Sequence, residues 1–136
     1  MISVLFDTNI LVDIMISREQ FIEDSERLVA YVAGKKICGF VTANSVTDVY
    51  YLVKKNLPKN IAREELKKLL YAFEIIEVSG PDCRAAFDIK IADYEDALLV
   101  VCAQKLAIDY IVTRDSDLLK YSNFNVVSPK ALLTLI

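Results

Sequence analysis

Short β-rich runs alternate with helical patterns along the whole chain, and this alternation restricts the possible folds more than any other feature. Strand-like runs lie at residues 3–6, 37–41, 74–78, 109–113 and 124–127. Strands that alternate with helices predict a parallel sheet with helices on both faces and right-handed crossovers. We therefore expect an α/β fold in three layers, α/β/α, around a central parallel five-stranded sheet.

The segments between these runs carry helical apolar spacing. Apolar residues recur at positions 46, 49, 50 and 53, for example, and Thr42 offers an N-cap just before them. Gly34 stands where a helix would end. Residues 97–103 contain no polar side chain, so we expect protein to enclose their helix on all sides. Helices are predicted over residues 10–16, 19–33, 43–55, 61–73, 79–91, 94–107, 116–121 and 129–136.

Length and composition are typical of one domain with a sizeable core. The 136 residues predict a single domain over 1–136, and 54% of them are apolar. Three Gly and three Pro are too few for a sandwich or barrel of many short strands. The apolar runs at 1–6 and 97–103 are too short to span a bilayer or to act as a secretory signal.

The chain contains no histidine. Ser-His-Asp and Cys-His sites, His-ligated zinc and imidazole proton transfer are therefore excluded. Acid–base chemistry must come from carboxylates, lysine, tyrosine or metal-bound water. Cys38, Cys83 and Cys102 are far apart and form no C-x-x-C pair, which predicts reduced thiols in a cytoplasmic protein.

Four aspartates are predicted to converge at the carboxyl edge of the sheet, where parallel α/β folds place their ligand crevice. Asp7 directly follows the first strand, and Asp115 follows the fourth by two residues. Asp48 lies on the helix after the second strand, and Asp96 opens the helix that leads to the fourth. Converging carboxylates repel one another unless divalent cations are bound, and all-oxygen ligation favours Mg²⁺ or Mn²⁺.

Each acid also has a simpler interpretation. Asp7 could cap the helix that follows it, and capping is the main interpretation of Asp93. Asp48 could lie on a solvated helix face, while Asp115 and Asp117 could be turn and cap residues. The joint placement of the acids at one edge favours a functional site over these separate roles.

Three segments resemble the acidic motifs of the PIN-domain nuclease family. Phe6–Asp13 is similar to the first motif, Asp93–Leu98 to the third and Ile111–Asp115 to the fourth. The resemblance runs along the whole chain, and small stand-alone members are commonly VapC-type toxins of toxin–antitoxin pairs. One position departs from the pattern. The second acid is usually Glu after Ser-x-x-x-x-x, whereas Thr42–Asp48 supplies Thr and the shorter Asp.

The resemblance implies a metal-dependent endoribonuclease in which Mg²⁺ or Mn²⁺ activates water for attack on a phosphodiester. The expected catalytic residues are Asp7, Asp48, Asp96 and Asp115. The expected metal ligands are Asp7, Asp96 and Asp115. Possible supporting residues are Asn9, Asp93, Thr113 and Asp117. Of these, Asn9 and Thr113 match polar motif positions and are expected to orient metal ligands or substrate phosphate.

The resemblance also implies an RNA substrate, an antitoxin partner and a homodimer. The apolar helices around Val49–Tyr50 and Leu66–Leu70 could contribute a dimer surface. The formal net charge is −3, but without the six aspartates named above the remaining charge is +3. A metal-loaded pocket with Arg114 and lysines at its rim could then hold a phosphate backbone.

Two other functions are compatible with the sequence. One is a PIN-like module that binds RNA or protein but has lost cleavage through the altered second acid. The other is a metal-dependent phosphohydrolase of another superfamily, although position 9 is Asn and so the D-x-D-x-T motif of haloacid-dehalogenase-like enzymes is absent.

Overall fold

The computed structural model describes residues 1–17 and 19–136, except for the side chains of residues 19–21. Within these residues, five parallel strands form one sheet in the order β3-β2-β1-β4-β5. The strands are β1 (Ile2–Phe6), β2 (Ile37–Thr42), β3 (Glu74–Ile76), β4 (Tyr110–Val112) and β5 (Val126–Val127). The predicted three-layer α/β/α fold is therefore confirmed.

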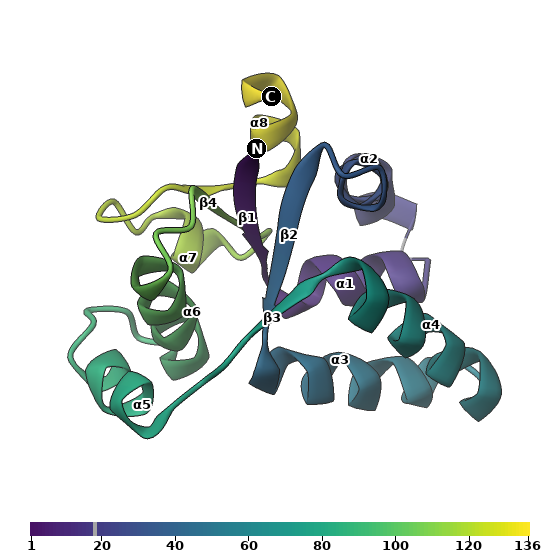
Figure 1. The fold of residues 1–136 in the computed structure, drawn as a ribbon, viewed down its shortest axis with the longest axis horizontal. Coiled ribbons are helices and arrows are strands. Elements are labelled where there is room, and N and C mark those ends of the chain that lie inside the picture. Colours follow the sequence, from purple (N-terminus) through teal and green to yellow (C-terminus); the bar gives the residue numbers. More distant parts are fainter. Residues whose placement is uncertain (18) are drawn as a thin grey trace.

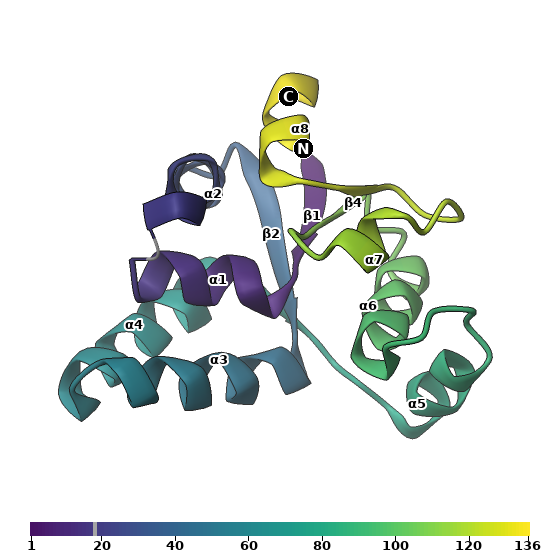
Figure 2. The same ribbon diagram turned by 180° about the vertical axis from the view of Figure 1, so that it is seen from behind.

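Helices cover both faces of the sheet (Figure 1). On one face lie α1 (Thr8–Met15), α2 (Glu19–Ala33), α3 (Ala43–Asn56) and α4 (Lys59–Ala72). On the other lie α5 (Gly80–Phe87), α6 (Tyr94–Lys105) and α7 (Ser116–Leu119). The last helix, α8 (Pro129–Leu135), packs against α2. Figure 2 shows the same layers from behind, with both termini beside the amino end of β1.

The central strand β1 separates two apolar clusters. Val4 and Phe6 belong to the cluster beneath α1–α4, and Leu5 belongs to the cluster around α6. Alternate side chains of a strand point to opposite faces, so this division follows directly from the sequence. Residues 96–103 of α6 are all buried, which confirms the enclosed helix predicted from its lack of polar side chains.

Each predicted strand and helix is found, with ends that differ by a few residues. The helix predicted over 79–91 ends at Phe87, where the backbone N–H of Asp88 closes the last turn. The helix over 19–33 ends as predicted, although Lys35 rather than Gly34 takes the left-handed conformation, with φ of 58°. Thr42 occupies the N-cap of α3 but forms no side-chain cap, because its hydroxyl donates to Ser45 instead.

In the part of the chain that the structure describes, no helix combines the length and the apolar character needed to cross a membrane.

Candidate active site

Asp7 stands at the junction of β1 and α1. Its backbone N–H donates to the carbonyl of Val112 at 3.0 Å, which fixes it beside the end of β4. Its Oδ1 accepts from the backbone N–H of Thr8 at 2.7 Å, so the residue caps α1. The side chain is only 8% exposed. The capping interpretation of Asp7 is thus correct, and it does not remove the carboxylate from the edge of the sheet.

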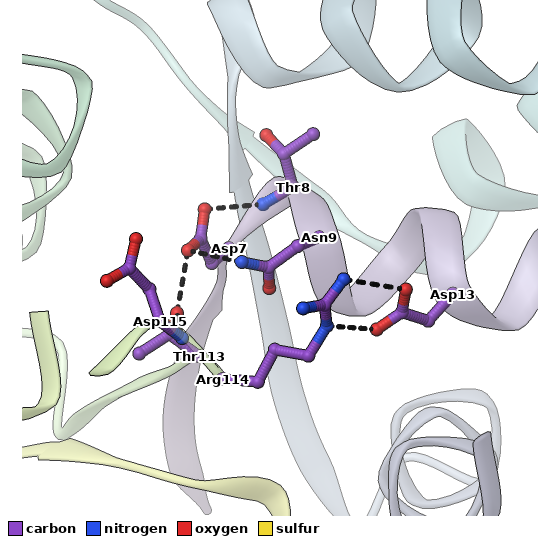
Figure 3. Close-up of polar contacts among 7 residues, drawn as sticks. All are labelled: Asp7, Thr8, Asn9, Asp13, Thr113, Arg114 and Asp115. Atoms are coloured by element: carbon purple, nitrogen blue, oxygen red, sulfur yellow. Dashed lines mark hydrogen bonds and ion pairs between the residues drawn. The ribbon is translucent and has the colours of Figure 1, made fainter. Parts of the chain in front are cut away.

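Thr113 connects Asp7 to the segment that carries Asp115 (Figure 3). The fully buried Thr113 hydroxyl donates to Asp7 Oδ2 at 2.7 Å and accepts from the backbone N–H of Asp115 at 3.0 Å. Asn9 Nδ2 donates to the same Asp7 oxygen at 3.3 Å. Both polar residues singled out from the motifs therefore contact Asp7, and Thr113 sets the relative position of two candidate ligands.

Two further acids are placed by the helices that they cap. Asp115 accepts from the N–H of Asp117 at 2.8 Å and of Leu118 at 3.3 Å, at the start of α7. Asp93 accepts from the N–H of Asp96 at 3.1 Å, at the start of α6. The predicted cap at Asp93 is present. Asp117 is exposed and contributes its backbone to the Asp115 cap.

Asp96 lies in the most repulsive environment of the site. Its side chain is 6% exposed, and its Oδ2 atom is buried without a hydrogen-bond partner among the described residues. Burial first, and then the nearby charges of Asp7, Asp93, Asp115 and Glu95, together raise the pKa of Asp96 to about 7. The acids of β1, α6 and α7 therefore share one electrostatic environment.

The pKa of Asp7 is also raised, mainly by burial. Hydrogen bonds from Thr113 and Thr8 oppose this shift because they stabilise the ionised carboxylate, while Asp115 and Asp93 add to it. Donors therefore hold the Asp7 carboxylate in place, while burial and the neighbouring acids disfavour its charged form.

Asp48 is half-buried on α3. It acts on Glu95, whose pKa is raised by burial, then by Asp48, Asp93 and Asp7. Glu95 therefore interacts with both Asp48 and Asp7, while a catalytic role for Asp48 stays a prediction. Our sequence interpretation missed Glu95, although it lies inside the third motif.

The donor set fits a hard divalent cation. The ligand atoms are all carboxylate or amide oxygens, and the orphaned Asp96 Oδ2 lacks the partner that a cation would supply. No preformed group of three or more Cys, Asp or Glu ligands exists among the described residues, so the predicted three-aspartate ligand set is not preassembled. Mg²⁺ commonly binds through one or two carboxylates and retains several waters, which agrees with this arrangement.

Arg114, predicted at the pocket rim, forms an ion pair with a buried acid. Its Nε and NH2 groups donate to the two carboxylate oxygens of Asp13, at 2.6 and 3.2 Å (Figure 3). Asp13 is fully buried in α1. This bidentate pair directs the guanidinium toward α1 rather than toward a phosphate, and it ties the segment between Thr113 and Asp115 to the helix that Asp7 caps.

Comparisons with known structures identify the same fold. VapBC2 from Rickettsia felis, solved with a promoter DNA fragment, aligns with a TM-score of 0.72 at 18% identity, covering 94% of this chain and 98% of that one. FitAB, solved with DNA, gives 0.70 at 19% identity and coverage of 93% and 94%. VapC20 from Mycobacterium tuberculosis, a sarcin–ricin loop cleaving toxin, gives 0.68 at 14% identity and coverage of 85% and 92%.

Sequence comparison identifies the family. A search of curated proteins found no match. A family model described as the PIN domain matches residues 3–117. This match covers most of the chain and includes all three motifs on which the predicted resemblance depended, and the chain therefore belongs to the PIN domain family.

Proposed function

We propose that this protein is a metal-dependent endoribonuclease and the toxin of a toxin–antitoxin pair. The observation that carries the proposal is the buried Asp96 carboxylate, which has an unpartnered oxygen and lies in the field of Asp7 and Asp115. Repulsion among these carboxylates destabilises the fold, and helix capping alone does not require them to lie close together. Membership of the PIN domain family and the likeness to VapBC and FitAB support the same function.

The protein's own residues would orient the reaction. Thr113 and Thr8 hold the Asp7 carboxylate in one rotamer, and the first turn of α7 does the same for Asp115. Mg²⁺ or Mn²⁺ held by Asp7, Asp96 and Asp115 would lower the pKa of a coordinated water and neutralise charge developing on the phosphoryl oxygens. Because the coordinated water would be the nucleophile, no side chain has to attack the phosphate, and no histidine is needed to activate one.

An apolar cavity of about 360 Å³ between α1, α2 and α4 supports an antitoxin partner. Leu11, Val29 and Leu69 contribute to its walls, and Glu65 and Lys68 lie at its polar margin. An apolar segment of a partner protein would bury this surface, as in helix-in-groove recognition. Structural neighbours solved as toxin–antitoxin complexes, including one from Klebsiella pneumoniae, favour an antitoxin as that partner.

The homodimer through the helices around Val49–Tyr50 and Leu66–Leu70 stays a prediction. Val49 is 1% exposed and belongs to the core. A dimer through α3 and α4 would therefore use the exposed large hydrophobic side chains of these helices. These are Tyr51, Ile61, Leu70 and Tyr71.

The proposed activity is tested with purified full-length protein and a labelled single-stranded RNA. Cleavage should require Mg²⁺ or Mn²⁺, stop on addition of EDTA and leave 5′-phosphate ends. Asp7→Asn and Asp96→Asn should each reduce the rate about 100-fold or more, because each removes a charge that would bind the metal. The matched control Asp24→Asn changes the same charge on α2 and should cleave like the unmodified protein.

The alternatives give different results. If metal-dependent cleavage is absent, or is equal in Asp7→Asn and the unmodified protein, the chain is a binding module and the proposed activity is wrong. Metal-dependent hydrolysis of small phosphomonoesters without RNA cleavage would identify a phosphatase instead.

A further inference from the structure

A second, larger cavity lies at the acidic edge, between the start of α6 and the segment around α7. Its volume is about 810 Å³, within the range of about 300–1,000 Å³ that is typical of ligand sites and far more than an ion needs. Both views place α6 and α7 side by side (Figures 1 and 2). The loop 90–93 before α6 and the loop 120–123 after α7 line the cavity, together with Asp96, Asp115 and Asp117.

Two lysines line this cavity without forming an ion pair in the described structure. Lys90 and Lys120 line it and are both exposed. In the described structure neither forms an ion pair, although four aspartates line the same space. By contrast, Lys105 is bound to Asp82 at 2.6 Å. The ammonium groups of Lys90 and Lys120 are therefore available to phosphate oxygens.

The wall of the cavity also includes an aromatic side chain held by the core. Tyr121 is half-buried and packs against the apolar cluster around α6, and its backbone N–H donates to the carbonyl of Leu118 at 3.0 Å. Asn123 follows it on the exposed part of the loop. An anchored ring can stack on a base, and a neighbouring amide can hydrogen-bond a base edge.

These groups match the chemistry of an unpaired nucleotide. The lysines suit its phosphates and Tyr121 suits its base, and Asp96 and Asp115, where the proposed chemistry would occur, line the same cavity. A base inside a duplex is stacked and paired, so it cannot reach a ring in a cavity wall. A phosphopeptide would use the lysines but would leave Tyr121 without a stacking partner.

We propose that this cavity seats the unpaired RNA nucleotide next to the scissile phosphate, with Tyr121 against its base and Lys90 and Lys120 on its flanking phosphates. The inference rests on the proposed ribonuclease function. It also assigns substrate selection to the loops 90–93 and 120–123, so that single-stranded RNA is preferred over duplex RNA.

Binding is measured separately from cleavage. The full-length Asp7→Asn protein, in which the RNA should stay intact, is titrated with a fluorescent single-stranded RNA in Mg²⁺, and anisotropy is followed at several salt concentrations. Lys90→Gln and Lys120→Gln should each reduce the slope of log K against log salt by about 0.7. Lys67→Gln on α4 removes the same charge away from the cavity and should leave affinity and slope unchanged.

Two variants at Tyr121 test the aromatic contact. Tyr121→Leu should weaken binding about tenfold, whereas Tyr121→Phe keeps the stacking ring and should bind like the parent protein. Each variant is first shown to unfold at the temperature of its parent, so that lost binding is not lost folding. Duplex RNA of the same sequence should compete poorly with the single strand.

The outcomes separate the two proposals. If the lysine and tyrosine variants weaken binding but the unmodified protein never cleaves RNA, the nucleotide site stands and the ribonuclease function is wrong. If the protein cleaves RNA but Lys120→Gln and Tyr121→Leu bind as tightly as Lys67→Gln and Tyr121→Phe, this inference is wrong. Equal affinity for duplex RNA or for a phosphopeptide would also overturn it.

Discussion

Replacing Asp96 with Asn should make the metal-free protein more stable. The folded structure holds this carboxylate in a buried position near four other acids, where its pKa rises to about 7. The same side chain in the unfolded chain has a pKa of about 3.9. Asn has nearly the same shape as a protonated Asp, so Asp96→Asn removes the charge and its repulsion with little change in packing.

The sign and size of the effect follow from proton binding. Between pH 4 and 7 the folded state binds more protons at Asp96 than the unfolded state does. The free energy of unfolding gained from this protonation is therefore fully present below about pH 4 and is lost as the pH rises to about 7. A difference of about three pKa units corresponds to about 4 kcal/mol. At pH 8 we expect Asp96→Asn to raise the free energy of unfolding by about 2–4 kcal/mol, because neighbouring carboxylates relax part of the repulsion.

Urea unfolding at pH 4.5 and at pH 8, in EDTA, measures this difference. The advantage of Asp96→Asn should be small at the lower pH and large at the higher one, and Asp24→Asn provides the baseline for a single Asp-to-Asn change. Mg²⁺ or Mn²⁺ should stabilise the parent protein and have much less effect on Asp96→Asn, since only the former keeps the ligand. Equal or lower stability of Asp96→Asn at pH 8 would refute the assignment of Asp96 to a repulsive acidic cluster.

Three further predictions concern other parts of the structure. Thr113→Val should lower the free energy of unfolding, measured in urea, by about 2–4 kcal/mol and weaken Mn²⁺ binding, because two hydrogen bonds are lost. Thr113→Ser should retain both bonds. A Val variant with normal Mn²⁺ affinity would contradict the positioning role. Gly39→Ala should lower the free energy of unfolding by about 1–3 kcal/mol, because the added Cβ would lie 2.8 Å from the Phe73 ring. Unchanged stability in urea unfolding would mean that the ring can move away from this Cβ. Glu95→Gln should slow RNA cleavage about 10–100-fold and more than Asp48→Asn, because Glu95 interacts with Asp7; the reverse order would assign the fourth acid to Asp48.

The layered fold was predictable because its signals are local. Residues 4–6 are apolar on both faces, as expected for a strand covered by helices on each side, and residues 97–103 could only suit an enclosed helix. Boundaries were less predictable. The helix after Ser79 was expected to continue to Ile91, since nothing in residues 88–91 forbids a further turn, yet it ends at Phe87.

The positions of Asp7 and Asp115 at the edge also followed from the sequence, because Asp7 comes directly after a strand and Asp115 follows the predicted end of another by two residues. Contacts between distant segments did not. Asp13 lies 101 residues from Arg114, and only the folded chain brings its buried carboxylate to that guanidinium. The interaction of Glu95 with Asp48 and Asp7 was missed for the same reason. Which acids face one another depends on the rotation of each helix, and the sequence pattern does not determine that rotation closely enough.

Some buried acids of this protein are paired with a cationic side chain, whereas Asp96 is not, and this difference is relevant to function. Asp13 is paired with Arg114, and Asp82 with Lys105, whose hydrogen bond lowers the pKa of Asp82. Asp96, equally buried, receives no cation, although Lys90 and Lys120 line the same cavity. A fold that can neutralise buried acids elsewhere, yet leaves this one in repulsion with its neighbours, retains an unfavourable energy that a bound divalent cation would offset.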